Sequence, residues 1–124
     1  MLLVFCQRAK LYRYVQNTKE WKERGVGEMK ILYHREHGTY RLLLRREQVH
    51  KVVCNILLTS DLEFRTMNTS DRAWVWAGMN YAEPENAEVE QLAVKFKTPE
   101  LAAQFKEAVD NAQLDLVNRH ANQG

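Results

Sequence analysis

The chain of 124 residues is long enough for one domain with a real core, and its 45% hydrophobic content is too high for a disordered protein. Its net charge is +2, but residues 1–54 carry 12 Lys and Arg against 5 Asp and Glu, whereas residues 55–124 carry 6 against 11. This division indicates either a basic face for an anionic partner, such as nucleic acid, a lipid headgroup or an acidic peptide, or merely exposed strands.

Cysteine usage and hydropathy bear on the compartment. Cys6 and Cys54 lie among apolar neighbours without the spacing of metal ligands, which predicts two free, buried thiols in a reducing environment. No apolar run approaches the roughly 20 residues of a membrane span, and the opening segment is too short for a signal peptide. We expect a cytosolic or nuclear chain.

Short apolar alternations separated by turn residues predict six or seven strands. A turn at Gly38 predicts a hairpin between the second and third of them. The predicted strands cover residues 9–15, 27–34, 37–47, 51–58, 62–65, 71–79 and 90–96.

The apolar period changes to that of a helix after residue 97. Thr98 is suited to cap this helix and Pro99 to open it. The helix presents one apolar stripe, made by Leu101, Phe105, Ala108, Val109, Ala112 and Leu116. The whole order predicts a mostly β fold, a small antiparallel barrel or bent sandwich capped by one C-terminal α-helix.

Catalytic motifs are missing from the sequence. It contains no nucleophile elbow, phosphate-binding loop, dinucleotide fingerprint or zinc-protease signature. The four carboxylates in residues 83–90 surround Pro84 and predict a solvated loop. We expect a binding module, with no metal or cofactor of its own and no enzymatic activity.

A charged segment, EWKERGVGEMKIL (residues 20–32), sets Trp21 among charged side chains. Taken alone it predicts a charged turn from which Gly25 and Gly27 lead the chain into the next strand. Further along, period two places Arg41 and Arg45 on one strand face and Arg46 on the other. Neighbouring early strands would bring the cations of both segments into one basic patch.

A second tryptophan segment is DRAWVWAGM (residues 71–79). Alternation puts Trp74 and Trp76 on one strand face. Such a pair is more often part of a core than of a contact surface, and the sequence leaves both interpretations open.

Five segments together resemble the Ran-binding domain, of the type found in the small cytosolic Ran-binding protein and the cytoplasmic-filament nucleoporin. The resemblance covers about residues 4–116 and rests on RAKLYRY, EWKERGVGEMKIL, RLLLRREQVHKVVCN, SDRAWVWAGMNYAE and LAVKFKTPELAAQFKEAVDNAQ. It implies one pleckstrin-homology-like barrel with a C-terminal helix over residues 1–124.

The resemblance also implies a function. The family binds the GTP form of the small GTPase Ran, captures its acidic C-terminal segment, stabilises the GTP state, and assists hydrolysis stimulated by the GTPase-activating protein. It thereby helps to disassemble export complexes, so ternary complexes with the GTPase-activating protein and export receptors are implied, in the cytoplasm or at the cytoplasmic face of the nuclear pore. GTP and Mg²⁺ would be held by Ran, and neither nucleic acid nor membrane is an expected partner.

Site residues follow from the matching positions. The Ran-contacting motif would comprise Trp21, Lys22, Glu23, Arg24 and Gly25. The basic patch for Ran's acidic segment would comprise Lys30, Arg45, Arg46, Lys51 and Asn55. Trp74 and Trp76 belong to a family motif whose role is core or interface.

The segment before RAKL departs from the family pattern. Family members usually carry an acidic arm before the RAKL segment, so this chain is expected to be trimmed at its N-terminal arm.

Two other functions remain open for such a barrel. A phosphoinositide module would need a basic pair at the first hairpin loop, where we expect Lys30 alone, and a proline-rich-peptide module would need an exposed aromatic groove.

Overall fold

The computed structural model describes residues 1–123, which form seven strands, one 3₁₀ turn and one long helix. The helix α1 spans Pro99–Gln123, and the short 3₁₀ turn spans Pro84–Asn86. The strands are β1 (Leu2–Val15), β2 (Glu20–His34), β3 (Thr39–Arg46), β4 (Val52–Leu58), β5 (Arg65–Met67), β6 (Ser70–Asn80) and β7 (Glu88–Phe96).

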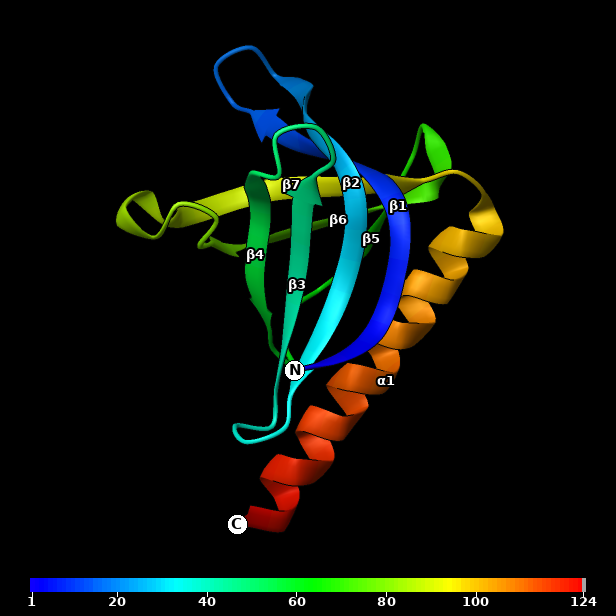
Figure 1. The fold of residues 1–124 in the computed structure, drawn as a ribbon. Helices are drawn as coiled ribbons and strands as arrows, with labels where there is room; N and C mark the ends of the chain where they lie inside the picture. The colour runs from blue at the N-terminus through cyan, green and yellow to red at the C-terminus, as the bar shows by residue number, and fades with distance from the viewer. Residues whose placement is uncertain (124) are drawn as a thin grey trace.

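All strands join one antiparallel sheet in the order β4-β3-β2-β1-β7-β6-β5. Figure 1 shows β1 to β4 running across the direction of β6 and β7, so the sheet folds over itself around the core. The free side of β4 approaches β6, where the Tyr81 amide donates a hydrogen bond of 2.8 Å to the Asn55 carbonyl. The predicted fold class, a mostly β bent sheet with one C-terminal helix, is confirmed.

Strand boundaries differ most from the predicted ones in β1, β2 and β5. β1 begins at Leu2 instead of Ala9, and β2 begins at Glu20, so the charged segment is part of a strand. Both extensions arise because β1 and β2 pair with each other along almost their full lengths, which satisfies backbone groups whatever the side chains are. The fifth strand begins at Arg65, after the predicted residues 62–64.

The core lies between the two halves of the sheet and the helix. Leu11, Met29, Ile31 and Leu42 are buried on the concave side of β1, β2 and β3. Phe105 enters from the helix and packs against strand aromatics, with its ring centroid 5.2 Å from that of Phe96 and 5.4 Å from that of Phe5. The apolar stripe predicted for the helix therefore faces the sheet.

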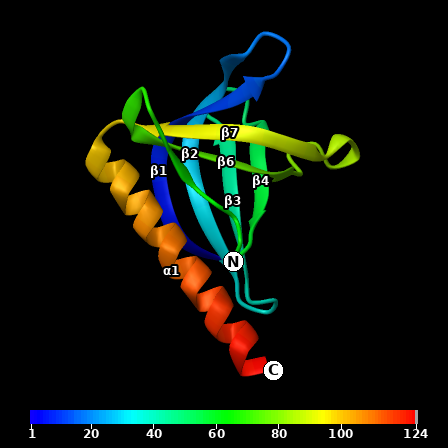
Figure 2. The ribbon, with the colours of Figure 1, turned by 180° about the vertical axis from the view of Figure 1, so that it is seen from behind.

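The helix begins as predicted and runs beside the sheet. The Leu101 amide donates to the Thr98 hydroxyl at 3.2 Å, which caps the first turn. Figure 2 shows α1 descending along the open side of the fold from the end of β7. Near its other end Tyr40 of β3 donates a hydrogen bond of 2.6 Å to Asp115. Neither this helix nor any other part of residues 1–123 supplies an apolar helix able to cross a membrane.

The cysteines differ from one another. Cys54 is fully buried in β4, and this burial raises the pKa of its thiol far above the ordinary value. Cys6 is only half-buried, contrary to expectation, because it lies on the outward side of β1, where its thiol is 2.9 Å from a carboxylate oxygen of Glu28. Both thiols are free.

Candidate partner-binding surface

The β1–β2 hairpin carries the first candidate group. Its turn, residues 16–19, is closed by Lys19 in the left-handed region, with a φ of 55°. Directly behind the turn Trp21 lies opposite Tyr14, and the two rings meet edge to face with centroids 5.2 Å apart. The half-buried Trp21 thus stabilises the hairpin through a cross-strand aromatic pair. Figure 1 shows this hairpin projecting beyond the rest of the sheet.

The charged residues after Trp21 surround a β-bulge. Leu11 pairs with Gly25 and Tyr12 with Glu23, which leaves Arg24 as the extra residue of β2. A bulge re-aims side chains and increases the local twist. Lys22 is exposed, and Glu23 is also exposed with its carboxylate 3.8 Å from the Lys10 ammonium. The predicted motif is therefore an irregular strand segment with exposed charged side chains.

The two glycines of the motif make room for β3. A Cβ on Gly27 would overlap the carbonyl oxygen of Arg45, so the backbone of β3 leaves no room for a side chain there. A Cβ on Gly25 would lie 2.6 Å from Cγ of Arg46, whose side chain crosses over it. The charged turn predicted ahead of these glycines is wrong, since the glycines and the charged residues before them all lie inside β2. The absence of side chains at Gly25 and Gly27 thus lets this part of β2 lie in close contact with Arg45 and Arg46 of β3.

The five residues predicted for the basic patch divide into three places. Strand register puts Lys30 and Asn55 in one row on the outer face of β2, β3 and β4, with Leu43 between them, and Arg45 one row further along. Arg46 lies on the opposite face, over Gly25, as the alternation predicted. Lys51 lies in the turn before β4.

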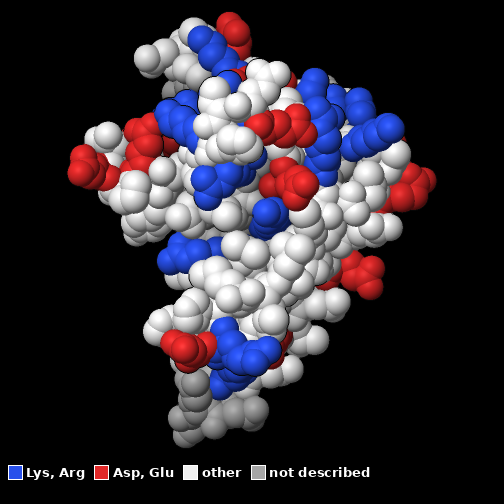
Figure 3. Space-filling view, in the orientation of Figure 1, with Lys and Arg blue, Asp and Glu red and all other residues white. Residues whose placement is uncertain are grey.

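Carboxylates accompany several of these cations. Lys51 is 3.3 Å from Glu83, and the hydrogen bond between them is the main reason why the pKa of that carboxyl lies below its ordinary value. Glu28 lies opposite both Arg8 and Arg45 in the strand register. Figure 3 shows blue and red side chains intermixed over the middle of this face. The outer face is thus mixed in charge, with a cationic majority.

Both tryptophans of β6 pack against other residues of the domain. Trp76 is 2% exposed, and its ring lies 5.3 Å from that of Phe64. Trp74 donates a hydrogen bond of 2.9 Å from Nε1 to the Ala102 carbonyl and lies under the Lys106 ammonium at 5.5 Å. The structure therefore places Trp76 in the core and Trp74 against the helix.

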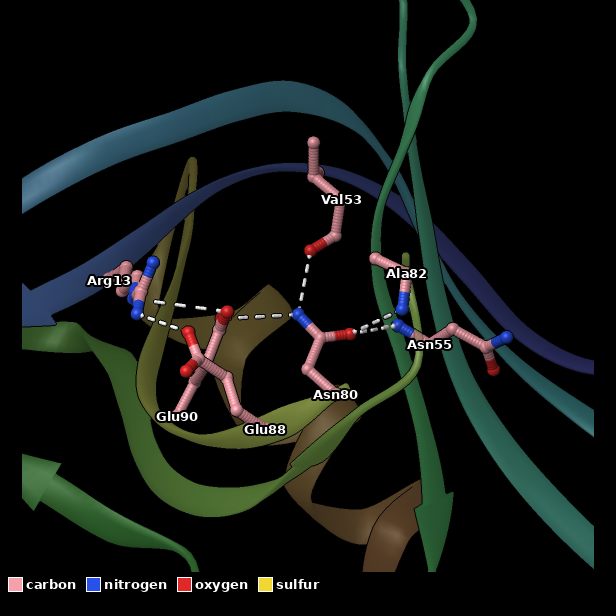
Figure 4. A network of polar contacts seen from close by, with 7 residues as sticks. All are labelled: Arg13, Val53, Asn55, Asn80, Ala82, Glu88 and Glu90. Carbon is pink, nitrogen blue, oxygen red and sulfur yellow. Dashed lines mark hydrogen bonds and ion pairs between the residues drawn. The ribbon is translucent and has the colours of Figure 1, made fainter. Parts of the chain in front are cut away.

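A buried polar network, which the sequence did not predict, joins β4 to β6 and β7 (Figure 4). The amide of Asn80 donates to the Val53 carbonyl at 3.0 Å and to Glu90 at 3.2 Å. Its oxygen accepts from the Asn55 amide at 2.9 Å and the Ala82 amide at 3.1 Å. Both polar atoms of the Asn80 side chain thus make a hydrogen bond to β4, the strand that carries Asn55.

Glu90 corrects the prediction of a solvated acidic loop. It lies inside β7 and is only 8% exposed, with Arg13 at 3.8 Å and the Asn80 amide as partners. Figure 4 shows Arg13 reaching both Glu90 and the exposed Glu88, the latter at 2.7 Å. The run of carboxylates in the sequence concealed this position, although period two puts Glu90 on the same inward face as Leu92, Val94 and Phe96.

A helix-capped bent sheet with a projecting charged hairpin defines a pleckstrin-homology-like domain. A family model described as the RanBP1 domain matches residues 2–115. The chain belongs to this family.

Individual relatives agree with the family match. The chain is 47% identical over 115 residues to E3 SUMO-protein ligase RanBP2 of Homo sapiens, a match that covers 93% of this chain and 4% of that protein. RanBP2 of Drosophila melanogaster is 43% identical over 114 residues, which are 87% of this chain and 4% of that protein. The chain thus spans a small fraction of the curated relatives that it matches.

Solved structures share the fold. The Ran-binding domain of Nup2 from Ashbya gossypii superposes with a TM-score of 0.79 at 25% identity, covering 93% of this chain and 97% of that one. The EVH1 domain of Dm DCP1, solved with the XRN1 DBM peptide, has a TM-score of 0.63 at 12% identity, covering 91% and 77%. The second likeness concerns the fold alone.

Proposed function

We propose that this domain is a non-catalytic binding module for the small GTPase Ran in its GTP form. The observation that carries the proposal is the family match over residues 2–115, within which the charged motif is built around a bulge and two close strand contacts. Long-lived recognition needs side chains held in place before the partner arrives. The Tyr14–Trp21 pair and the glycine contacts supply that rigidity for the motif.

The outer face of β2, β3 and β4 would receive the acidic C-terminal segment of Ran. Lys30 and Arg45 provide positive charge there, and Arg41 is held by a hydrogen bond of 3.2 Å to Asn55. Leu43 and Leu57 lie on the same face and offer apolar contact between the charges. Charge accelerates and orients such an encounter, while apolar contact slows its dissociation.

Capture of a mobile segment would couple the domain to the nucleotide state. If the segment leaves the GTPase body in only one state, a domain that binds the released segment shifts the population toward that state. On this basis we propose that the domain stabilises the GTP form and assists hydrolysis stimulated by the GTPase-activating protein. It would thereby promote disassembly of export complexes at the cytoplasmic face of the nuclear pore, with GTP and Mg²⁺ bound by Ran.

The alternative functions find less support at the positions where they were expected. A proline-rich ligand needs exposed aromatics, but Trp76 is in the core and Trp74 is bonded to the helix. The first hairpin loop carries Lys19, whereas Lys30 lies mid-strand, contrary to expectation. Behind that loop Arg13 pairs with Lys22 across the two strands, but Arg13 is already engaged by Glu88 at 2.7 Å.

Calorimetric titration with Ran tests the proposal. We expect much tighter binding to Ran loaded with a non-hydrolysable GTP analogue than to Ran loaded with GDP. Ran that lacks its C-terminal segment serves as the matched control and should lose most of this difference. Equal affinity for the two nucleotide states would overturn the proposal.

A further inference from the structure

A concentration of cations adjoins the surface described above, where β1 meets β7 beside the start of α1. A pocket of about 440 Å³ opens there. Its polar lining includes five basic side chains, Arg8, Lys10, Arg72, Lys95 and Lys97. Figure 3 shows Lys and Arg gathered over this corner of the molecule, at the upper right of the view. We call it the β1–β7 pocket.

Strand register forces two of these cations together. Lys10 pairs directly with Lys95, and their neighbours on both strands, Leu11 and Phe96 among them, are buried. Both lysines therefore project from the same, outward side of the sheet. Directly opposed residues have Cβ atoms about 5 Å apart, and like charges at this position destabilise a sheet. An anion between them would remove this cost.

Most of the positive charge at the pocket is uncompensated. Among the side chains of residues 1–121, no carboxylate lies within ion-pair distance of Arg72, Lys95 or Lys97. Lys10 has only Glu23 at 3.8 Å, whereas Arg8 is fully paired with Glu47 at 2.6 Å. The outer face around Glu28 is more evenly balanced. The pocket is thus a place where an anion meets several free cations.

Arg72 adds a fixed donor group. Its Nη1 donates to the Phe96 carbonyl at 3.3 Å and to the Lys97 carbonyl at 3.2 Å, which anchors the guanidinium at the end of β7. Guanidinium groups recognise phosphate through paired hydrogen bonds, and lysine ammonium groups act as point charges beside them. The lining also includes the apolar residue Leu101 at the start of the helix. The combination suits a phosphate-bearing ring of small-molecule size.

We propose that the β1–β7 pocket binds a phosphorylated inositol, either as a soluble polyphosphate or as a lipid headgroup. An extended acidic peptide presents successive side chains on alternate sides, so its carboxylates on one face are spaced about 7 Å apart. The cations here instead come from β1, β6 and the end of β7 and line one open pocket. This arrangement matches a compact ligand with several charges. The proposal is independent of Ran binding.

The decisive variant is Lys95→Gln, because it removes one of the opposed lysines. We expect inositol hexakisphosphate to bind the wild-type domain in calorimetry at physiological ionic strength, and Lys95→Gln to weaken that binding about tenfold. The matched control is Arg35→Gln, which removes the same charge at the exposed β2–β3 turn and should leave the affinity unchanged. Thermal unfolding should show Lys95→Gln to be at least as stable as the wild type, since it relieves repulsion.

Two further measurements distinguish a lipid headgroup from a soluble polyphosphate and show whether the β1–β7 pocket is the binding site. Binding to vesicles containing phosphatidylinositol bisphosphate is compared with binding to phosphatidylserine vesicles of equal total charge. Preference for the former indicates that the ligand is a lipid headgroup. Binding of inositol hexakisphosphate without binding to either vesicle indicates that the ligand is a free polyphosphate. Equal weakening by Lys95→Gln and Arg35→Gln, or no binding to the wild type, would overturn the proposal. If the wild type binds no inositol phosphate while Lys95→Gln impairs Ran binding, the pocket serves an acidic segment of the GTPase instead.

Discussion

The two tryptophan-bearing segments of this domain use the same side chain in opposite ways. In β6, Trp76 is 2% exposed and packs against Phe64 inside the core. In β2, Trp21 is half-buried and has Tyr14 as its aromatic partner on a projecting hairpin. The surroundings, and not the residue type, decide whether a tryptophan maintains the fold or shapes a surface. Substitutions in the two segments should therefore separate stability from binding.

The largest expected effect is that of Trp76→Ala. Removal of a buried indole should lower the free energy of unfolding by about 4 kcal/mol, because both the transfer energy and the packing around the cavity are lost. Trp21→Ala should cost about 1 kcal/mol, the worth of one partly exposed aromatic pair, while weakening Ran binding more than its stability loss explains. Chemical denaturation and calorimetry measure the two quantities. Similar stability losses for both variants would remove the distinction between the segments.

The glycines of the hairpin allow a sharper test. Gly27→Ala should destabilise the domain by about 3 kcal/mol, because the new methyl group meets the backbone of Arg45, which cannot move without breaking the β2–β3 pairing. Gly25→Ala should cost about 1 kcal/mol, since the exposed side chain of Arg46 can rotate away. Denaturant midpoints of the two variants give the comparison. Equal losses of stability for the two variants would show that the backbone of β3 moves aside as easily as the side chain of Arg46.

A pH effect should report on the contact between β3 and the helix. Burial, and then the hydrogen bond to Asp115, raise the pKa of Tyr40 from 10.0 to about 12. A group whose pKa is raised in the folded state stabilises it fully below its unfolded pKa. This contribution, up to about 2 kcal/mol, should therefore be lost as the pH rises from about 10 through 12. Tyr40→Phe should flatten the dependence in that range, and an unchanged slope would contradict this assignment.

The smallest effect concerns the basic surface. Arg45→Glu should lower the association rate with Ran about tenfold and weaken its salt dependence, because Arg45 lies on the outer face with Lys30. Arg46→Glu changes the charge equally on the opposite face and should alter the rate less. Stopped-flow kinetics over a range of ionic strengths compares the two. Equal changes in rate and salt slope would show that position on the sheet is irrelevant.

Much of the architecture could be predicted from local patterns. The cap at Thr98, the apolar stripe facing the sheet through Phe105, and the hairpin closed by Gly38 all depend on neighbours within a few residues. The alternation also placed Arg45 and Arg46 on opposite faces. These features were predictable because helix and strand periods are properties of the chain itself.

The candidate site was less predictable because it depends on pairing between distant residues. Arg24 is a bulge residue only because β1 has one residue fewer at that point. Glu90 is buried, unlike the other carboxylates of its segment, because Asn80 and Arg13 meet it there. Lys10 and Lys95 oppose each other through a register that no local pattern contains.

The sequence by itself determined the order of strands and helix, the cationic excess of the first half and the blocks that match the RanBP1 domain family. Only the tertiary structure decided which tryptophan is core and which cations share a face. Periodicity and capping are encoded over a few residues, and so they can be read along the chain. Burial and charge clustering are sums over strands brought together from distant parts of the chain, and so they exist only in the folded domain.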